Sequence, residues 1–261
     1  MIQAAATDPL DSSVLRVNTV SPERPWDWLS KGWQDLLRAP RFSLTYGAAF
    51  VAVSLLLTLG LVVGHLFFIV PALAAGFFLI APMLGIGLYR ISENLEEGRA
   101  VRFCQALEAW RRNEVQLAAM ALVLVLLMLV WMLAAVLVFA VFYNGIVPTD
   151  RSFLVYAFLS GENNAFVAAG ILSGGVVAAF AYSITVITVP LLMDRPVNVM
   201  TAMRTSMAAV RKNWAAMTLW AALIVMFVGV GILTYYVGLL VAMPLVGHAT
   251  WHAYRDLVPR D

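Results

Sequence analysis

Long apolar runs without charged residues dominate this chain. Four segments contain no Asp, Glu, Lys or Arg: residues 42–89, 115–149, 163–193 and 213–254. A helix needs about 20 residues to cross the hydrocarbon layer of a membrane. The first and last runs are each long enough for two crossings, and each middle run for one with some surplus. The runs lack the period-two alternation of a membrane barrel, so we expect helices.

The runs predict six membrane-spanning helices that form three hairpins. Glycine and proline interrupt the first and last runs where turns are needed, at Gly64, Pro71, Gly231 and Gly238. The expected spans are residues 42–64, 67–90, 115–142, 165–192, 214–234 and 236–255. The predicted fold class is therefore all-α, with a polytopic membrane domain over residues 26–258 and a flexible cytoplasmic segment over residues 1–25.

Composition supports the bilayer as the solvent of this protein. The chain is 62% hydrophobic and only 12% charged, whereas soluble domains are about 25% charged. So few charges cannot cover the surface of a soluble fold of this length. The net charge of +2 is too small to indicate nucleic acid as a partner. The single cysteine, Cys104, excludes an intrachain disulfide and a four-thiolate metal site.

The positions of the basic residues predict the orientation. Sixteen of the seventeen Lys and Arg residues fall in the N-terminal segment, the second and fourth connections and the tail, and the exception is Arg151. Basic residues mark the cytoplasmic side of short loops, so we expect both termini in the cytoplasm. Residues 1–41 hold no apolar core typical of a cleavable signal. Arginine outnumbers lysine, 15 to 2, which favours a GC-rich genome and a bacterial host, so the expected location is a bacterial inner membrane.

A threefold internal pattern accompanies the hairpins. An amphipathic stretch precedes each one, at residues 28–42, 101–115 and 199–215, and ends in Arg, one further residue, and Pro40, Asn113 or Asn213. Proline and asparagine disfavour continuing a helix, so the chain is expected to bend there from the membrane surface into a span. The repeat predicts pseudo-threefold packing of the hairpins.

Aromatic and basic residues near these junctions and near the C-terminus predict anchoring in the headgroup layer. The expected anchors are Trp33, Arg38, Trp110, Arg111, Arg211, Trp251, Tyr254 and Arg255. In the alternative interpretation the apolar residues of the three amphipathic stretches pack onto the other helices as ordinary core. Both interpretations can hold on different faces of the same helix.

Small residues and prolines recur in the predicted spans. The returning helix of each hairpin contains a proline that is expected to kink it: Pro82, Pro190 and Pro244. GlyxxxGly spacings at Gly60/Gly64 and Gly170/Gly174 would permit close approach between helices.

The sequence offers little catalytic chemistry. It contains no P-loop, HExxH or GxSxG motif, and no charged residue is expected at mid-membrane depth, where pumps usually need one. We therefore expect a protein that is not an enzyme, with no catalytic residues and no cofactor. A polar-lined cavity for a solute would draw on the hydroxyl residues Ser173, Tyr182, Ser183, Thr185 and Thr188.

His248 and His252 lie four residues apart and share one helix face. The pair could ligate one metal ion, but it cannot supply the two opposite axial ligands of a haem. The simpler interpretation is structural, because Trp251, Tyr254 and Arg255 beside it suit a helix end at the headgroups. A proton-handling role is the third interpretation.

The stretches DWLSKGWQDLLRAP (27–40) and PLVGHATWHAYRDLV (244–258) resemble the bacterial domain-of-unknown-function family 2189. The resemblance covers about residues 26–258 and implies an integral membrane protein. Members are sometimes labelled cytochrome c oxidase subunits, which implies association with a respiratory complex. Three histidines are too few for the haem–copper catalytic subunit itself.

Two main functional hypotheses follow. The first is an accessory or scaffold subunit of a membrane complex, such as a respiratory one, with the bilayer and other inner-membrane proteins as partners. The alternative is a carrier or channel for a neutral or lipidic solute. A third, metal or haem contact through His248 and His252, has less support.

Overall fold

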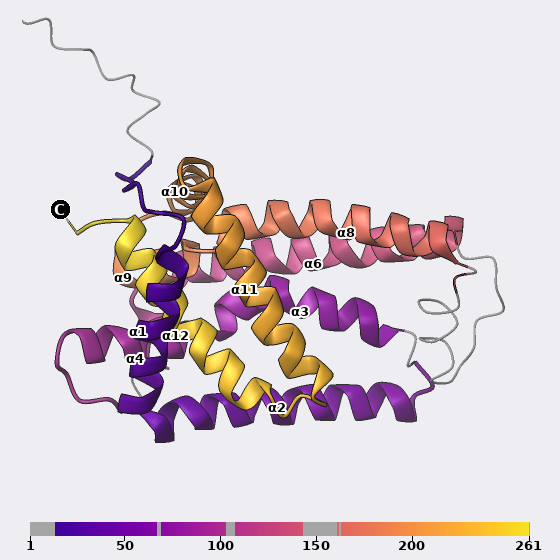
Figure 1. The fold of residues 1–261 in the computed structure, drawn as a ribbon, viewed down its shortest axis with the longest axis horizontal. Helices are drawn as coiled ribbons and strands as arrows, with labels where there is room; N and C mark the ends of the chain where they lie inside the picture. The colour runs from indigo at the N-terminus through magenta and orange to yellow at the C-terminus, as the bar shows by residue number, and fades with distance from the viewer. Residues whose placement is uncertain (1–13, 67–68, 103–107, 143–160, 162, 261) are drawn as a thin grey trace, which may run out of the picture.

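The computed structural model describes residues 14–66, 69–102, 108–142, 161 and 163–260 (Figure 1). In this part of the chain every regular element is a helix, which confirms the all-α prediction there. The helices are α1 (Arg24–Arg38), α2 (Pro40–Val63), α3 (Val70–Leu84), α4 (Ile86–Glu96), α6 (Glu114–Phe142), α8 (Asn164–Thr185), α9 (Thr188–Asp194), α10 (Val199–Lys212), α11 (Trp214–Leu233) and α12 (Leu239–Leu257).

Four stretches of the described helices are long and apolar enough to cross a membrane: α2, α6, α11 and the continuous stretch Asn164–Asp194. The pair α3–α4, bent by 41°, would be a fifth crossing if it counts as one span. The predicted six spans are not confirmed. The expected sixth, α12, has polar residues throughout its C-terminal half and packs against α1, α2, α4 and α11. It therefore lies largely inside the protein and faces little lipid.

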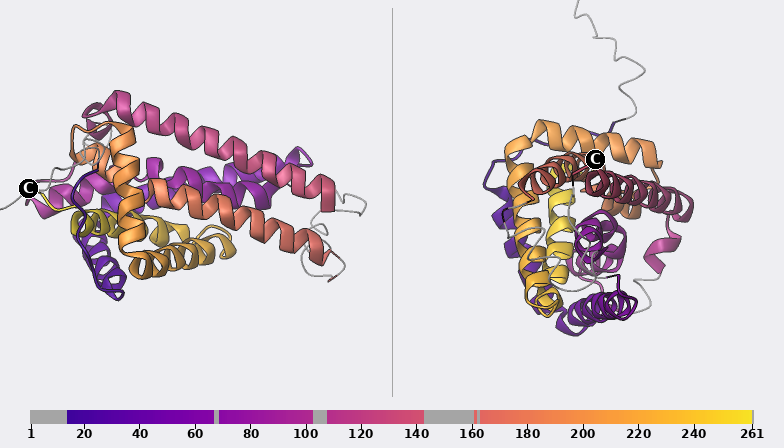
Figure 2. Two further views of the ribbon diagram at one scale, coloured as in Figure 1. Left: turned by 90° about the horizontal axis from the view of Figure 1, so that it is seen from above. Right: turned by 90° about the vertical axis from the view of Figure 1, so that its right-hand side faces the viewer.

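The short helices gather at one end of the molecule. Figure 1 shows α1, α4, α9, α10 and the C-terminus at the left, while the long apolar helices extend to the right. The end-on view in Figure 2 places α3 between α2 and the α6–α8 pair. Helix α2 packs mainly against α12, and α3 mainly against α6. The first predicted hairpin is thus not a closely packed pair, and pseudo-threefold packing is not confirmed.

Glycines allow α12 to lie against its neighbours with backbones almost in contact. A Cβ atom on Gly47 of α2 would lie only 2.1 Å from the carbonyl oxygen of Leu240, and one on Gly32 of α1 only 2.7 Å from the amide nitrogen of Ala249. Pro244 has no N–H to donate to the Leu240 carbonyl. The oxygen that approaches Gly47 is therefore the one that Pro244 leaves without its helical donor.

Each of the three repeated junctions coincides with a break before a long helix. Helix α1 ends at Arg38 and α2 begins at Pro40, α6 begins directly after Asn113, and α10 and α11 are separated by Asn213. At each bend one carbonyl accepts a bond from the amide four residues on, which starts the next helix. The pairs are Ala39–Ser43, Asn113–Leu117 and Asn213–Met217, at 2.9–3.0 Å.

The two junction asparagines have a second role. The Asn213 side chain accepts a hydrogen bond from the Val20 amide (2.8 Å) and donates one to the Asn18 carbonyl (2.9 Å). The Asn113 side chain donates to the carbonyls of Leu192 (3.2 Å) and Val197 (3.1 Å). Asn213 therefore holds the non-helical segment around residues 18–20, and Asn113 holds the end of α9 and the connection that follows it.

The flexible segment predicted over residues 1–25 is too long at its C-terminal end. Besides the bonds to Asn213, the Asn18 amide donates to the Leu257 carbonyl (2.8 Å), and the side chains of Leu15, Val17 and Val20 pack on the core. Helix α1 already begins at Arg24. Residues 1–13 lie outside the described part of the chain.

On α1 the core interpretation holds for part of the apolar face, and the headgroup interpretation stays a prediction for the rest. Leu29 and Leu36 are buried against the other helices. Trp26 and Trp33, which share the same helix face by their spacing, are exposed. On α10 the methionines Met200 and Met207 face outward, and Ala202 and Ala209 are buried. The middle stretch is described only in part, because residues 103–107 lie outside the described chain.

Candidate functional site

A cleft of about 630 Å³ is lined by residues of α3, α4, α8, α10, α11 and α12, together with Trp131 of α6. Figure 1 shows α8 and α11 diverging from their ends near α10, and the two are not among the closely packed helix pairs. Ile171 on α8 and Val225 on α11 line the cleft and are exposed. The cleft therefore opens sideways between these two helices.

Small residues on α8 create the hollow. Its lining face carries Gly170, Gly174, Gly175, Ala178 and Ala179. A Cβ atom on Gly170 or Gly175 would meet no atom within 4 Å, whereas one on Gly174 would lie 2.8 Å from the ring of Trp131. Trp131 in turn donates a hydrogen bond from Nε1 to the Ala72 carbonyl (2.9 Å), which fixes its position. Gly170 thus leaves space open in the cleft, and Gly174 leaves space for the Trp131 ring.

The bend between α3 and α4 forms the opposite wall. Pro82, Gly85 and Tyr89 all line the cleft, at a spacing that places them on one helix face. The kink predicted at Pro82 appears as the 41° bend, with α3 ending at Leu84 and α4 starting at Ile86. The ring of Tyr89 lies over Gly85, where a Cβ atom would be 2.9 Å from the hydroxyl oxygen.

Two of the hydroxyl groups that line the cleft bond to helix carbonyls. Tyr182 donates to the Met217 carbonyl (2.7 Å) and Thr250 to the Val246 carbonyl (2.7 Å). Of the five residues expected to line a polar cavity, only Tyr182 and Thr185 are lining residues. Ser173, Ser183 and Thr188 bond to the carbonyls of Ala169, Phe180 and Ile184 on their own helix. The cleft is therefore mainly apolar, in contrast to the polar-lined cavity expected.

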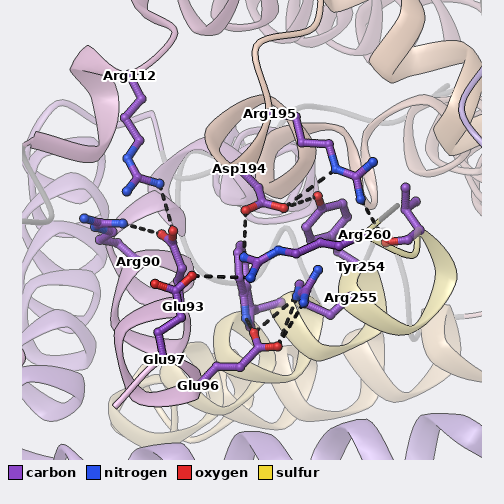
Figure 3. A network of polar contacts seen from close by, with 12 residues as sticks. Arg90, Glu93, Glu96, Glu97, Arg112, Asp194, Arg195, Tyr254, Arg255 and Arg260 are labelled. Carbon is purple, nitrogen blue, oxygen red and sulfur yellow. Dashed lines mark hydrogen bonds and ion pairs between the residues drawn. The ribbon is translucent and has the colours of Figure 1, made fainter. Parts of the chain in front are cut away.

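A network of ion pairs lies at the polar end of the molecule (Figure 3). Glu93 of α4 is 3% exposed and pairs with three arginines, Arg90, Arg99 and Arg112. Arg112 lies just before α6, so this carboxylate joins α4 to the start of α6. A buried carboxylate needs such partners, because leaving it unpaired is strongly unfavourable.

Two further carboxylates in Figure 3 bind the C-terminal end of α12. Glu96 accepts hydrogen bonds from the Trp251 indole (3.0 Å) and from the Arg255 guanidinium (3.1 Å). Asp194, at the end of α9, accepts one from the Tyr254 hydroxyl (2.6 Å). Trp251 and Tyr254 are completely buried. Their predicted role as headgroup anchors is therefore wrong, because both side chains bond to carboxylates inside the protein.

The remaining predicted anchors lie at the same polar end of the molecule. Trp33 and Trp110 are 45% and 37% exposed, and the arginines Arg38, Arg111 and Arg211 are exposed as well. Their contact with lipid headgroups stays a prediction. Pro190 falls in α9, just after the short break that separates α8 from α9, and Pro244 lies inside α12.

The two histidines belong to different hydrogen-bond networks. His248 is fully buried, with Nε2 at 2.9 Å from the Ser43 hydroxyl and Nδ1 at 2.8 Å from the Ser92 hydroxyl. His252 lies with Nε2 at 2.7 Å from the Asp35 carboxylate. Both ring nitrogens of His248 are thus occupied, and no group of three or more His, Cys, Asp or Glu suited to a metal ion occurs among the described residues. The structure favours a helix-joining role for His248.

Most residues of the cleft, and much of the ion-pair network, belong to one segment of the chain whose sequence matches a known family. Residues 69–194 match the family model described as predicted integral membrane protein (DUF2189). The segment contains α3, α4, α6, α8 and α9, and with them two walls of the cleft. The stretches 27–40 and 244–258 lie outside it, so the resemblance seen there stays an expectation. Neither curated proteins nor solved structures gave a match.

Proposed function

We propose that this integral membrane protein is not an enzyme and that it binds the apolar chain of a lipidic molecule in the cleft between α8 and α11. The carrying observation is a cleft of about 630 Å³ that opens between α8 and α11, two helices that lie in stretches long and apolar enough to cross a membrane. Small-molecule sites commonly enclose about 300–1,000 Å³. From Gly170 to Thr185 the lining follows α8 for roughly 22 Å at 1.5 Å per residue, which suits an extended chain.

The lining chemistry supports an apolar chain. None of the residues that line the cleft is Asp, Glu, Lys, Arg or His. In a bilayer the hydrophobic effect does not drive a chain from lipid into protein, since both environments are apolar. Selection must then come from packing against the Gly- and Ala-rich face of α8 and from the few polar groups present. A carrier or storage site for a neutral lipid has these properties.

Native mass spectrometry in mild detergent tests the proposal. We expect wild-type protein to retain a lipid, and Gly175→Leu to lose it, because the leucine would fill space where a Cβ now meets nothing within 4 Å. The matched control is Gly229→Leu on α11, which is equally open at Cβ and does not line the cleft. Wild-type protein without bound lipid, or equal retention by both variants, would contradict the proposal.

An accessory or scaffold role in a membrane complex, such as a respiratory one, is the second candidate. It is favoured by the surface of α2, where Leu56 and Leu57 are exposed and a Cβ on Gly60 would meet nothing within 4 Å. Another membrane helix could approach closely there. Affinity purification should then recover a stoichiometric membrane partner that is lost in Gly60→Leu. Isolation of the protein alone would count against this role.

The proposed location is a bacterial inner membrane with both termini in the cytoplasm. The clustering of α1, α4, α9, α10 and the C-terminus at one end of the molecule supports it (Figure 1), because these elements and the segments that directly follow them carry most of the basic residues. Phosphatase reporters fused to either terminus should be inactive, and fluorescent-protein fusions should fold. An active phosphatase at either terminus would contradict the orientation.

A further inference from the structure

Two buried hydroxyl groups at one end of the cleft lack a hydrogen-bond partner among the described residues. Tyr89 and Thr185 are 3% and 5% exposed, and both line the cleft. The structure shows no hydrogen bond for either hydroxyl, in contrast to those of Tyr182 and Thr250. The hydroxyl oxygens themselves are not fully buried, because neither is among the buried side-chain atoms without a partner. Both oxygens are therefore accessible from the cleft. Each hydroxyl can therefore donate to and accept from a molecule in the cleft, either a ligand or water.

The two hydroxyls mark the end of the cleft nearest the ion-pair network. Thr185 is the last residue of α8, directly before the break that leads into α9. Tyr89 lies in the first turn of α4, and α4 packs against α9. At the other end the lining residues are Ala75, Trp131 and Gly170, and the Trp131 N–H is already bonded to Ala72. The cleft is therefore amphipathic along its length, with unpaired hydroxyls at one end only.

We infer that Tyr89 and Thr185 bind the uncharged hydroxyl or carbonyl headgroup of a long-chain lipid whose chain extends along α8 toward Gly170. This inference rests on the proposed function and specifies its ligand class. A hydroxyl can donate and accept, so the pair suits either kind of neutral head. A charged head would be buried without a counter-ion, because no Asp, Glu, Lys, Arg or His is among the described residues that line the cleft. Burial of an unpaired charge is strongly unfavourable.

Photoaffinity labelling of the full chain in phosphatidylcholine vesicles tests this ligand class. Three probes carry a mid-chain diazirine and a terminal alkyne on the same long chain: a primary alcohol, the matching carboxylic acid at neutral pH, and the matching alkane. We expect the alcohol to label α8 and α11 peptides more strongly than the acid or the alkane. Tyr89→Phe and Thr185→Val should each lower labelling by the alcohol about fivefold, the effect of one hydrogen bond, and leave alkane labelling unchanged.

The control variant is Tyr182→Phe, which removes a hydroxyl of the same cleft that already bonds to the Met217 carbonyl. It should leave the ratio of alcohol to alkane labelling at the wild-type value. Alkane labelling also shows whether each variant keeps the cleft. If Tyr89→Phe loses alkane labelling because it misfolds, Thr185→Val alone tests the headgroup assignment.

The outcomes distinguish a failure of the proposed function from a failure of the headgroup assignment. If no probe labels the cleft, the proposed function itself fails. If all three probes label it equally and neither variant alters the ratio, the cleft binds chains but the hydroxyls hold water, and the headgroup assignment is overturned. Preferential labelling by the acid would likewise overturn a neutral headgroup.

Discussion

His248 of α12 and Ser43 of α2 are joined by a hydrogen bond of 2.9 Å between Nε2 and Oγ, and both residues are completely buried. The other ring nitrogen bonds to Ser92 of α4 at 2.8 Å. One imidazole thus connects three helices whose residues are far apart in the sequence.

Replacing His248 by alanine should destabilise the protein by about 3 kcal/mol, because two buried serine hydroxyls lose their partner. Thermal unfolding in detergent measures the loss. The triple variant Ser43→Ala/His248→Leu/Ser92→Ala should recover much of it, since no polar group is then left unpaired. The exposed His65, replaced by asparagine to suit its positive φ of 56°, serves as the control. A His248→Ala protein as stable as wild type would refute the bridging role.

A methyl group on Gly47 should separate α2 from α12. The Cβ atom of Gly47→Ala would lie 2.1 Å from the Leu240 carbonyl oxygen, which is backbone and cannot rotate away. We expect a loss of stability of about 3 kcal/mol or more, at the upper end of overpacking effects. Gly60→Ala on the same helix meets nothing within 4 Å and should be neutral or slightly stabilising. Equal melting temperatures for the two variants would show that the crossing is looser than described.

Loss of the Asn213 side chain should release the N-terminal segment. Asn213→Ala removes the bonds to Val20 and Asn18, so trypsin should cleave after Arg16 several times faster than in wild type. Asn198→Ala is the matched control, because Asn198 caps α10 through the Thr201 amide and makes no bond to this segment. Unchanged cleavage in Asn213→Ala would mean that other contacts hold the segment.

Acid should weaken the attachment of α1 to α12. Burial would raise the pKa of Asp256, but hydrogen bonds from Arg24 and Trp28 outweigh it and leave the pKa below the ordinary 3.8. A lowered carboxyl pKa contributes stability above the ordinary value, and that stability is lost as pH falls through the lowered one. The melting temperature should therefore drop below about pH 4, and less steeply in Asp256→Asn. An identical acid slope in this variant would contradict the assignment.

The sequence predicted the helical class and the helix boundaries at the three junctions, because these depend on local residues. Runs without charge, Pro40 and the two asparagines carry that information directly. The place of α12 was not predicted, since its polar residues suit either a headgroup belt or a protein interior. Trp251 pairs with Glu96, a residue 155 positions away, and nothing local indicates that partner.

The cleft was only partly foreseeable. Thr185 and Tyr182 were expected to line a cavity, but Tyr89 was missed, although Pro82, Gly85 and Tyr89 share one helix face. Serines near a cavity also look alike in sequence, and only the structure shows that Ser173 and Ser183 bond to their own helix. The hollow itself depends on how far α8 and α11 diverge, which no short pattern encodes.

The most direct test of the central claim is an experimental density map of the protein in lipid nanodiscs, with the space between α8 and α11 resolved. The account predicts an elongated density that begins beside the Tyr89 and Thr185 hydroxyls and runs along the glycines of α8 to Gly170. A map in which α8 packs directly against α11, with no space left between them, would contradict it.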